Sequence, residues 1–248
     1  MPSQNRARIY AGPNGSGKSL LYKEISKEYN SGIFVNADEI EKQLKTVGII
    51  DLTDFNLKVD VLQFENFKNF ESSLSLIKKA SNEGFTISLE VKDNFILNKS
   101  KLTNSYEAAF VASFIRYALL NEKRSFTYET VMSDRYKLEE INHANQLNYK
   151  TYLYFICTDD FEKNIERVKN RVLKDGHNVH EEKIKSRYFK TLENLADAIR
   201  LVHRAYIFDN SGNQYELIAE IYQGNAFKFH SSSIPEWFEK YVYNKFKF

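Results

Sequence analysis

The chain has 248 residues, 42% of them hydrophobic, which is ample for a packed core and fits one α/β domain with elaborations better than two small domains. Its 35 Lys and Arg nearly balance 33 Asp and Glu, which gives a formal net charge of +2. This balance excludes a strong overall positive charge of the kind that attracts nucleic acid or an anionic membrane. Recognition of a partner must therefore depend on a local site.

The single cysteine and the lack of long apolar runs narrow the class of protein further. Cys157 has no partner for an internal disulfide, and its apolar run, residues 152–157, favours a buried strand residue over a reactive thiol. No apolar run approaches the roughly 20 residues needed to span a bilayer, and the N-terminal residues leave no room for a secretory signal. We therefore expect a cytoplasmic protein without a membrane partner.

A glycine-rich loop with the sequence GPNGSGKS occupies residues 12–19 and matches the pattern G-x-x-x-x-G-K-[ST] in full. Residues 8–11 before it are typical of a buried strand, and residues 19–29 after it carry apolar side chains at helical spacing. A strand before the loop and a helix after it are the context that this phosphate-binding motif needs. The motif therefore predicts that the protein binds a nucleoside triphosphate.

Each position of this loop has a chemical task. Gly12, Gly15 and Gly17 leave backbone N–H groups free to wrap a phosphate, because no side chain blocks them. Lys18 is expected against the β- and γ-phosphates, and the Ser19 hydroxyl is expected to ligate Mg²⁺. The predicted nucleotide-binding residues are Gly12, Pro13, Asn14, Gly15, Ser16, Gly17, Lys18, Ser19 and Leu20.

Asp38 is the first candidate for catalysis. It lies between residues 32–36, which are typical of a second strand, and a helical run at residues 41–47. A carboxylate at this place can face the γ-phosphate across the site and act as a general base for an acceptor. Alternatively, Asp38 is the N-cap of the helix, with Glu41 three residues later. The sequence leaves both interpretations open.

The middle of the chain is its least regular part. Residues 51–104 are nearly neutral in charge and indicate an insertion, with an extra strand expected at residues 85–91. A helix at residues 105–122 then leads to the third core strand at residues 125–128.

Glu129 closes this third strand, where its carboxylate could hold a Mg²⁺-bound water or a substrate hydroxyl. Thr130 and Ser133 add hydroxyl groups nearby, so the three residues are the candidates for substrate binding. The alternative for Glu129 is an acidic residue at the edge of a loop.

Arg167 and Arg171 lie four residues apart on a helix predicted at residues 160–173, and therefore share one face of it. Such a segment over a phosphate site fits a lid that clamps ATP and stabilises transition-state charge, whereas a solvated amphipathic helix explains the spacing equally well. His177 and His180 form an H-x-x-H pair, but the sequence offers no third metal ligand.

Strands at residues 151–157 and 205–209 and a long helix at residues 181–204 complete an alternation of strand and helix. This alternation predicts an α/β fold with a P-loop NTPase or kinase-like parallel sheet covered by helices on both faces. Ligands of such sheets bind at the carboxyl ends of the strands, where the glycine-rich loop and the acidic candidates fall.

The C-terminal extension, residues 225–248, is rich in aromatic side chains. Residues 233–236, SIPE, match a capping box with proline in the first turn, so a terminal helix is expected. This helix either docks on its own domain or presents a surface to a partner or second subunit.

Taken together, several short motifs resemble, in order, those of the zeta toxin family of P-loop kinases. They are GPNGSGKS at 12–19, FVNADEI at 34–40, YETVMS at 128–133, RVKNRV at 167–172 with GHNV at 176–179, and DNS at 209–211. The resemblance covers the whole core except for the insertion and the C-terminal extension.

The resemblance implies ATP-dependent phosphorylation of a hydroxyl, in the best-known members the 3′-OH of UDP-N-acetylglucosamine. It implies Asp38 as general base, Lys18 and Ser19 as ligands of phosphate and Mg²⁺, and Glu129 as a substrate-site carboxylate. It also implies Arg167 and Arg171 as lid arginines, and a small antitoxin protein that obstructs the ATP site.

The departures from the family pattern fall on the acceptor side. Val131 stands where relatives often carry threonine, Ser133 stands where the best-known toxins have arginine, and about fifty residues are inserted near the expected substrate pocket. Two alternatives therefore stay open. One is a kinase that acts on a nucleic-acid end or a small metabolite, although the near-neutral insertion disfavours nucleic acid. The other is an ATP-dependent switch without kinase activity.

Overall fold

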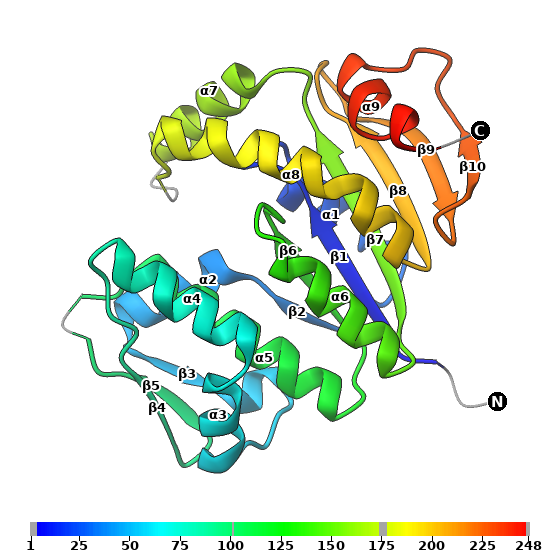
Figure 1. The fold of residues 1–248 in the computed structure, drawn as a ribbon. Helices are drawn as coiled ribbons and strands as arrows, with labels where there is room; N and C mark the ends of the chain where they lie inside the picture. Colours follow the sequence, from blue (N-terminus) through cyan, green and yellow to red (C-terminus); the bar gives the residue numbers. More distant parts are fainter. Residues whose placement is uncertain (1–3, 101, 174–177, 247–248) are drawn as a thin grey trace. The chain divides into compact units, whose positions relative to one another are not determined.

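A computed structural model describes residues 4–100, 102–173 and 178–246 (Figure 1). Contacts divide the chain into two compact units. The first unit is Met1–Ser31 together with Thr127–Phe248, and the second unit is Gly32–Phe126. The single domain expected from the sequence stays a prediction. Within the described ranges, no helix is both long enough and apolar enough to cross a bilayer.

The first unit is built on a mostly parallel sheet in the order β10-β9-β8-β7-β1-β6. β7 pairs in parallel with both β1 and β8, whereas β9 and β10 continue the sheet in antiparallel orientation. The strands are β1 (Arg6–Ala11), β6 (Phe126–Thr130), β7 (Lys150–Cys157), β8 (Arg204–Asp209), β9 (Glu216–Tyr222) and β10 (Ala226–Phe229).

Helices cover both faces of this sheet. Successive residues of a strand point to opposite faces, and Leu21 packs with Tyr154 on one face while Trp237 contacts Phe155 on the other. Figure 1 shows α6 and α8 crossing one face. The predicted α/β class with a P-loop kinase-like sheet is confirmed. The helices are α1 (Lys18–Ile25), α6 (Tyr136–Gln146), α7 (Phe161–Val172), α8 (Glu181–Leu201), α9 (Glu236–Tyr241) and the short 3₁₀ helix η2 (Tyr243–Lys245).

The second unit consists of helices around a small antiparallel sheet in the order β3-β5-β4. Phe64 packs edge-on against Phe110 and Phe114, so that a long helix, α5, lies at the centre of its core. Its elements are β2 (Ile33–Val35), α2 (Ala37–Thr46), β3 (Ile49–Asp51), η1 (Leu52–Phe55), α3 (Val61–Lys68), α4 (Glu71–Asn82), β4 (Leu89–Lys92), β5 (Phe95–Asn98) and α5 (Ser105–Asn121). The predicted insertion therefore consists of regular helices and strands. The strand expected at residues 85–91 is present as β4, which is shorter and begins later in the chain.

The C-terminal extension docks on its own unit, which was the simpler of the two expectations. Trp237 is 4% exposed, and Phe238 and Val242 are fully buried. The predicted capping box at residues 233–236 is wrong, because α9 begins after Pro235 without a side-chain cap. The Ser233 backbone N–H instead donates to the Ser231 hydroxyl oxygen at 3.1 Å, and this is the N–H that a capping box would pair with the Glu236 side chain.

Candidate functional site

The glycine-rich loop leaves the carboxyl end of β1 in a conformation that only glycine fits. Gly15 has φ +79° and Gly17 has φ +105°, in the left-handed region that L side chains rarely adopt. A Cβ atom added at Gly12 would lie 2.1 Å from the Ile156 carbonyl oxygen, and one at Gly15 would lie 2.5 Å from the Asn164 carbonyl oxygen. The loop therefore packs its backbone directly against β7 and α7, with no room for a side chain at Gly12 or Gly15.

Lys18 is the first residue of α1 and curls back over the loop. Its Nζ donates hydrogen bonds to the carbonyl oxygens of Gly12 and Pro13, both at 2.9 Å. The ammonium group is thereby held above the backbone that is expected to wrap a phosphate. Leu20, predicted with the loop, is exposed on α1.

Ser19 and Glu129 come together at the same edge of the sheet. The Ser19 hydroxyl donates to Glu129 Oε2 at 3.0 Å, although the two residues are 110 positions apart. A hydroxyl and a carboxylate beside a phosphate loop are hard oxygen donors of the type that Mg²⁺ prefers, so these two residues fit that ion. Among the described residues, no group of three or more His, Cys, Asp or Glu side chains is placed to hold a metal ion.

The loop after β6 carries the other two predicted substrate residues. The Thr130 hydroxyl oxygen accepts a hydrogen bond from the backbone N–H of Met132 at 3.2 Å, and Ser133 is half-buried nearby. Met132 is buried with φ +61°, which is a strained conformation for a residue with a side chain. Strain of this kind persists only when the surroundings hold it in place.

Two polar residues of α8 hold that loop. Thr191 Oγ1 donates to the Val131 carbonyl oxygen at 2.8 Å, and Asn194 Nδ2 donates to the Met132 carbonyl oxygen at 3.0 Å. Both are at least nine-tenths buried, which is unusual for polar side chains on a helix. Sequence analysis missed them, and the only signal was their polarity within an otherwise apolar helix face.

Arg167 of α7 lies against the loop that follows β8. Its Nη2 donates to the Asn210 carbonyl oxygen at 2.9 Å. The side chain therefore does not extend into solvent, as it would on a solvated surface helix. Asn210 in turn donates from Nδ2 to the Ser16 carbonyl oxygen at 2.8 Å. Arg171 is half-buried on the next turn of α7. The Arg167 side chain and the glycine-rich loop are therefore joined through one residue.

Buried polar atoms without a hydrogen-bond partner among the described residues gather around the loop. They are Asn14 Oδ1, Ser16 Oγ, Asn164 Nδ2 and Arg167 Nη1. Such groups are costly to leave unsatisfied.

Asp38 belongs to the second unit, and its predicted role as general base stays a prediction. The alternative role, N-cap of α2, is wrong. Asn36 is the N-cap, and its side chain accepts hydrogen bonds from the N–H groups of Asp38 at 2.8 Å and Glu39 at 3.4 Å. The Asp38 carboxylate is thus left exposed in the first turn.

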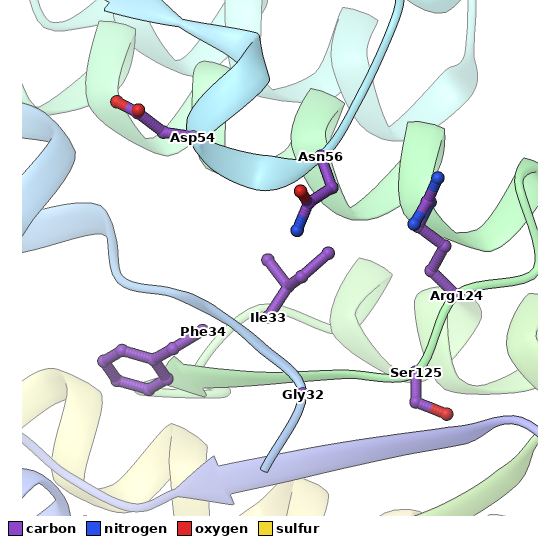
Figure 2. A pocket seen from close by; sticks show the side chains of 7 residues that line it. All are labelled: Gly32, Ile33, Phe34, Asp54, Asn56, Arg124 and Ser125. Atoms are coloured by element: carbon purple, nitrogen blue, oxygen red, sulfur yellow. The ribbon is translucent and has the colours of Figure 1, made fainter. Parts of the chain in front are cut away.

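A pocket of about 640 Å³ opens within the second unit (Figure 2). Figure 2 shows the side chain of Ile33 pointing towards Asn56, with Arg124 and Ser125 at one side. The pocket lies at the beginning of β2, whereas Asp38 follows the end of that strand. None of the predicted site residues lines it.

Two further features of the sequence, Cys157 and the H-x-x-H pair, remain to be located in the structure. Cys157 is fully buried, and burial raises the pKa of its thiol, which confirms a structural cysteine. Of the H-x-x-H pair, His177 lies outside the described residues, as does Gly176 of the motif at 176–179, and His180 is exposed at the start of α8.

Comparison with known proteins finds solved structures with a similar fold. No family model matches the chain, and no curated protein does. Solved structures do match, among them a chain of the native AvrRxo1-ORF1:AvrRxo1-ORF2 complex, with a TM-score of 0.59, 14% identity and 97% of this chain covered. The same complex solved with ATP gives a TM-score of 0.54 at 15% identity. The chain spans 64% of the length of that AvrRxo1 complex chain.

A second match is a chain of the PezAT chromosomal toxin–antitoxin system of Streptococcus pneumoniae. It has a TM-score of 0.51 and 12% identity, and the alignment covers 100% of this chain and 81% of that one. Fold and loop together define an α/β protein of the P-loop class. The resemblance to zeta toxins seen in the sequence is confirmed at the level of the fold.

Proposed function

We propose that the protein is an ATP-dependent kinase of the zeta toxin type, which phosphorylates a hydroxyl of a UDP-sugar such as UDP-N-acetylglucosamine or of a related nucleotide. The observation that carries this proposal is the wrapped glycine-rich loop, with the Lys18 ammonium above it and Ser19 bonded to Glu129 beside it. The AvrRxo1-ORF1:AvrRxo1-ORF2 complex, which has the same fold, has been solved with ATP, and this supports ATP as the donor.

Each residue of the proposed site has a role in phosphoryl transfer. Lys18 binds the β- and γ-phosphates, and Arg167 and Arg171 stabilise the charge that develops on the transferred group. Ser19 and Glu129 would hold Mg²⁺, which neutralises phosphate charge when bound. Asp38 takes the proton of the acceptor hydroxyl, and Glu129, Thr130 and Ser133 bind the acceptor.

We also propose that a small antitoxin protein silences the enzyme in the cytoplasm. The support comes from the two matched systems, since one is a complex of two open reading frame products and the other is a toxin–antitoxin pair. Co-purification of the chain with the product of a neighbouring small gene tests this part of the proposal.

The experiment for the kinase activity offers the purified protein Mg²⁺ and ATP with a panel of UDP-sugars, nucleosides and RNA ends. Mass spectrometry then detects a gain of one phosphoryl group on the acceptor. ATP consumption without any phosphorylated acceptor would favour the ATP-dependent switch, and labelling of RNA ends alone would favour the nucleic-acid kinase.

Two variants separate the donor half of the site from the acceptor half. Lys18→Ala is expected to abolish ATP binding and transfer, because it removes the ammonium from the phosphates. Asp38→Asn is expected to bind ATP normally and to lower the transfer rate by about 10²- to 10⁴-fold, the usual contribution of a general base. Full turnover in Asp38→Asn would remove the base assignment.

A further inference from the structure

A chain of hydrogen bonds runs from the C-terminal helix α9 to the loop after β8. The Trp237 indole Nε1 donates to Asp209 Oδ1 at 2.7 Å. The same carboxylate accepts from the Ser211 hydroxyl at 2.8 Å and from the Ser211 backbone N–H at 3.0 Å. Three donors from two distant parts of the sequence therefore fix the Asp209 side chain.

The next residue, Asn210, connects this loop to the glycine-rich loop. It is 9% exposed and its backbone N–H donates to the Cys157 carbonyl oxygen at 2.7 Å. Its Nδ2 donates to the Ser16 carbonyl oxygen at 2.8 Å, and a Cβ atom at Gly17 would lie only 2.5 Å from the same Nδ2. Asn210 thus touches the two residues that come directly before Lys18.

Asn210 lies in a turn that the Asp209 carboxylate closes. Asp209 is the last residue of β8, and its two bonds to Ser211 close a tight turn with Asn210 in the middle. A hydrogen bond to a charged carboxylate is stronger than a neutral one, so the Trp237 donor adds substantially to the rigidity of this turn. Small displacements of groups that position a substrate have large effects on function.

We propose that Trp237 is a positioning residue for the nucleotide site and acts through Asp209 and Asn210 on the Ser16–Lys18 backbone. This inference rests on the proposed function and deepens its ATP-binding half. The aromatic C-terminal extension accordingly contributes to the nucleotide site through Trp237, whose hydrogen bond to Asp209 reaches the supporting loop.

The test compares Trp237→Phe with a matched control in the same helix. Trp237→Phe keeps an aromatic ring but removes the N–H donor. Phe238→Leu shrinks an adjacent, fully buried ring that makes no hydrogen bond, so it reports the effect of lost packing alone. For each protein, titration calorimetry gives the Kd for Mg²⁺-ADP, and steady-state assays separate the KM for ATP from kcat.

Hydrogen exchange of the free protein gives a readout that needs no nucleotide. The Ser16 N–H donates to the Pro13 carbonyl oxygen and the Leu21 N–H donates to the Gly17 carbonyl oxygen, so both amides report on the loop. We expect Trp237→Phe to speed their exchange and to raise the Kd for ADP and the KM for ATP by about 5- to 10-fold, with kcat within about twofold. We expect Phe238→Leu to lower the melting temperature while the Kd stays within about twofold.

A double-mutant cycle with Asn210→Ala tests the route. If Trp237 acts through Asn210, Trp237→Phe adds less than about twofold to the Kd of the Asn210→Ala protein. Three outcomes would each overturn the inference. They are unchanged loop exchange in Trp237→Phe, a Kd for ADP that is the same in Trp237→Phe as in a wild type that binds ADP, and effects of Phe238→Leu equal to those of Trp237→Phe. If the wild type binds no nucleotide, the proposed function fails while loop exchange still decides the role of Trp237.

Discussion

Gly15 lies where the glycine-rich loop packs directly against α7. It combines φ +79° with a virtual Cβ only 2.5 Å from the Asn164 carbonyl oxygen. Gly48 offers a matched control, because its φ is +76° and a Cβ there would meet nothing within 4 Å. Alanine at either position carries the backbone cost of about 1 kcal/mol for a positive φ, but only Gly15→Ala adds a clash with backbone.

We therefore expect Gly15→Ala to reduce the free energy of unfolding by about 1–3 kcal/mol more than Gly48→Ala does. It should also abolish ADP binding, since the loop must move to relieve the clash, whereas Gly48→Ala should bind ADP like the wild type. Urea denaturation and ADP titration of the two variants measure both effects. Equal destabilisation by the two substitutions would show that the loop has room for a side chain.

At the scale of elements, the first turn of α2 holds both the residue that caps the helix, Asn36, and the proposed general base, Asp38. Asn36 accepts two backbone N–H hydrogen bonds, whereas Asp38 caps nothing and keeps its carboxylate exposed. Asn36→Ala is expected to lower the free energy of unfolding by about 1 kcal/mol, the usual cost of a lost N-cap. Asp38→Asn should stay within about 0.5 kcal/mol of the wild type, because it alters only a favourable charge at a helix start.

Thermal and urea unfolding of the two variants, followed by circular dichroism, check this expectation. Phosphoryl transfer should show the reverse order, with Asp38→Asn slowed by about 10²- to 10⁴-fold and Asn36→Ala as active as the wild type at a temperature where it is folded. A larger loss of stability in Asp38→Asn than in Asn36→Ala would return Asp38 to a structural role.

The elements that sequence reasoning predicted well are those with a local cause. The strand before Gly12 and the helix after Lys18 follow from the motif and its apolar spacing, and both are present as β1 and α1. The alternative that made Asp38 the N-cap of α2 is wrong, because Asp38 followed by Glu41 fits a capping pattern in the sequence, whereas Asn36 is the cap.

Other elements depend on partners far along the chain. β3, β5 and β10 are three or four residues long and are strands only because a neighbour pairs with them. The same holds for the candidate site. The glycine-rich loop was evident from sequence, whereas Asn164 and Asn210 reach it only through the order of the strands, and Trp237 reaches Asp209 only through the docking of α9.

At the scale of the whole molecule, we expect His203 to make the stability of the fold depend on pH. It lies between α8 and β8, with its ring edge-on to those of Tyr152 and Tyr222. Burial, followed by the nearby charges of Lys150 and Arg204, lowers the pKa of this imidazole below the ordinary value of about 6.5. The folded protein therefore favours the neutral ring.

Because the unfolded chain protonates His203 more readily, it binds more protons than the folded chain as the pH falls through about 6.5. The free energy of unfolding should therefore decrease with falling pH in this range and should stop changing, as far as His203 is concerned, below its folded pKa.

His203→Gln keeps a polar side chain of similar length but cannot titrate. Urea denaturation of both proteins at a series of pH values on either side of about 6.5 isolates the contribution, since all other groups titrate in both. We expect the difference in stability between wild type and variant to shift in favour of the variant as the pH decreases. A difference that is constant across the series would mean that the fold does not favour the neutral ring, and that Lys150 and Arg204 are too well screened by solvent to act on it.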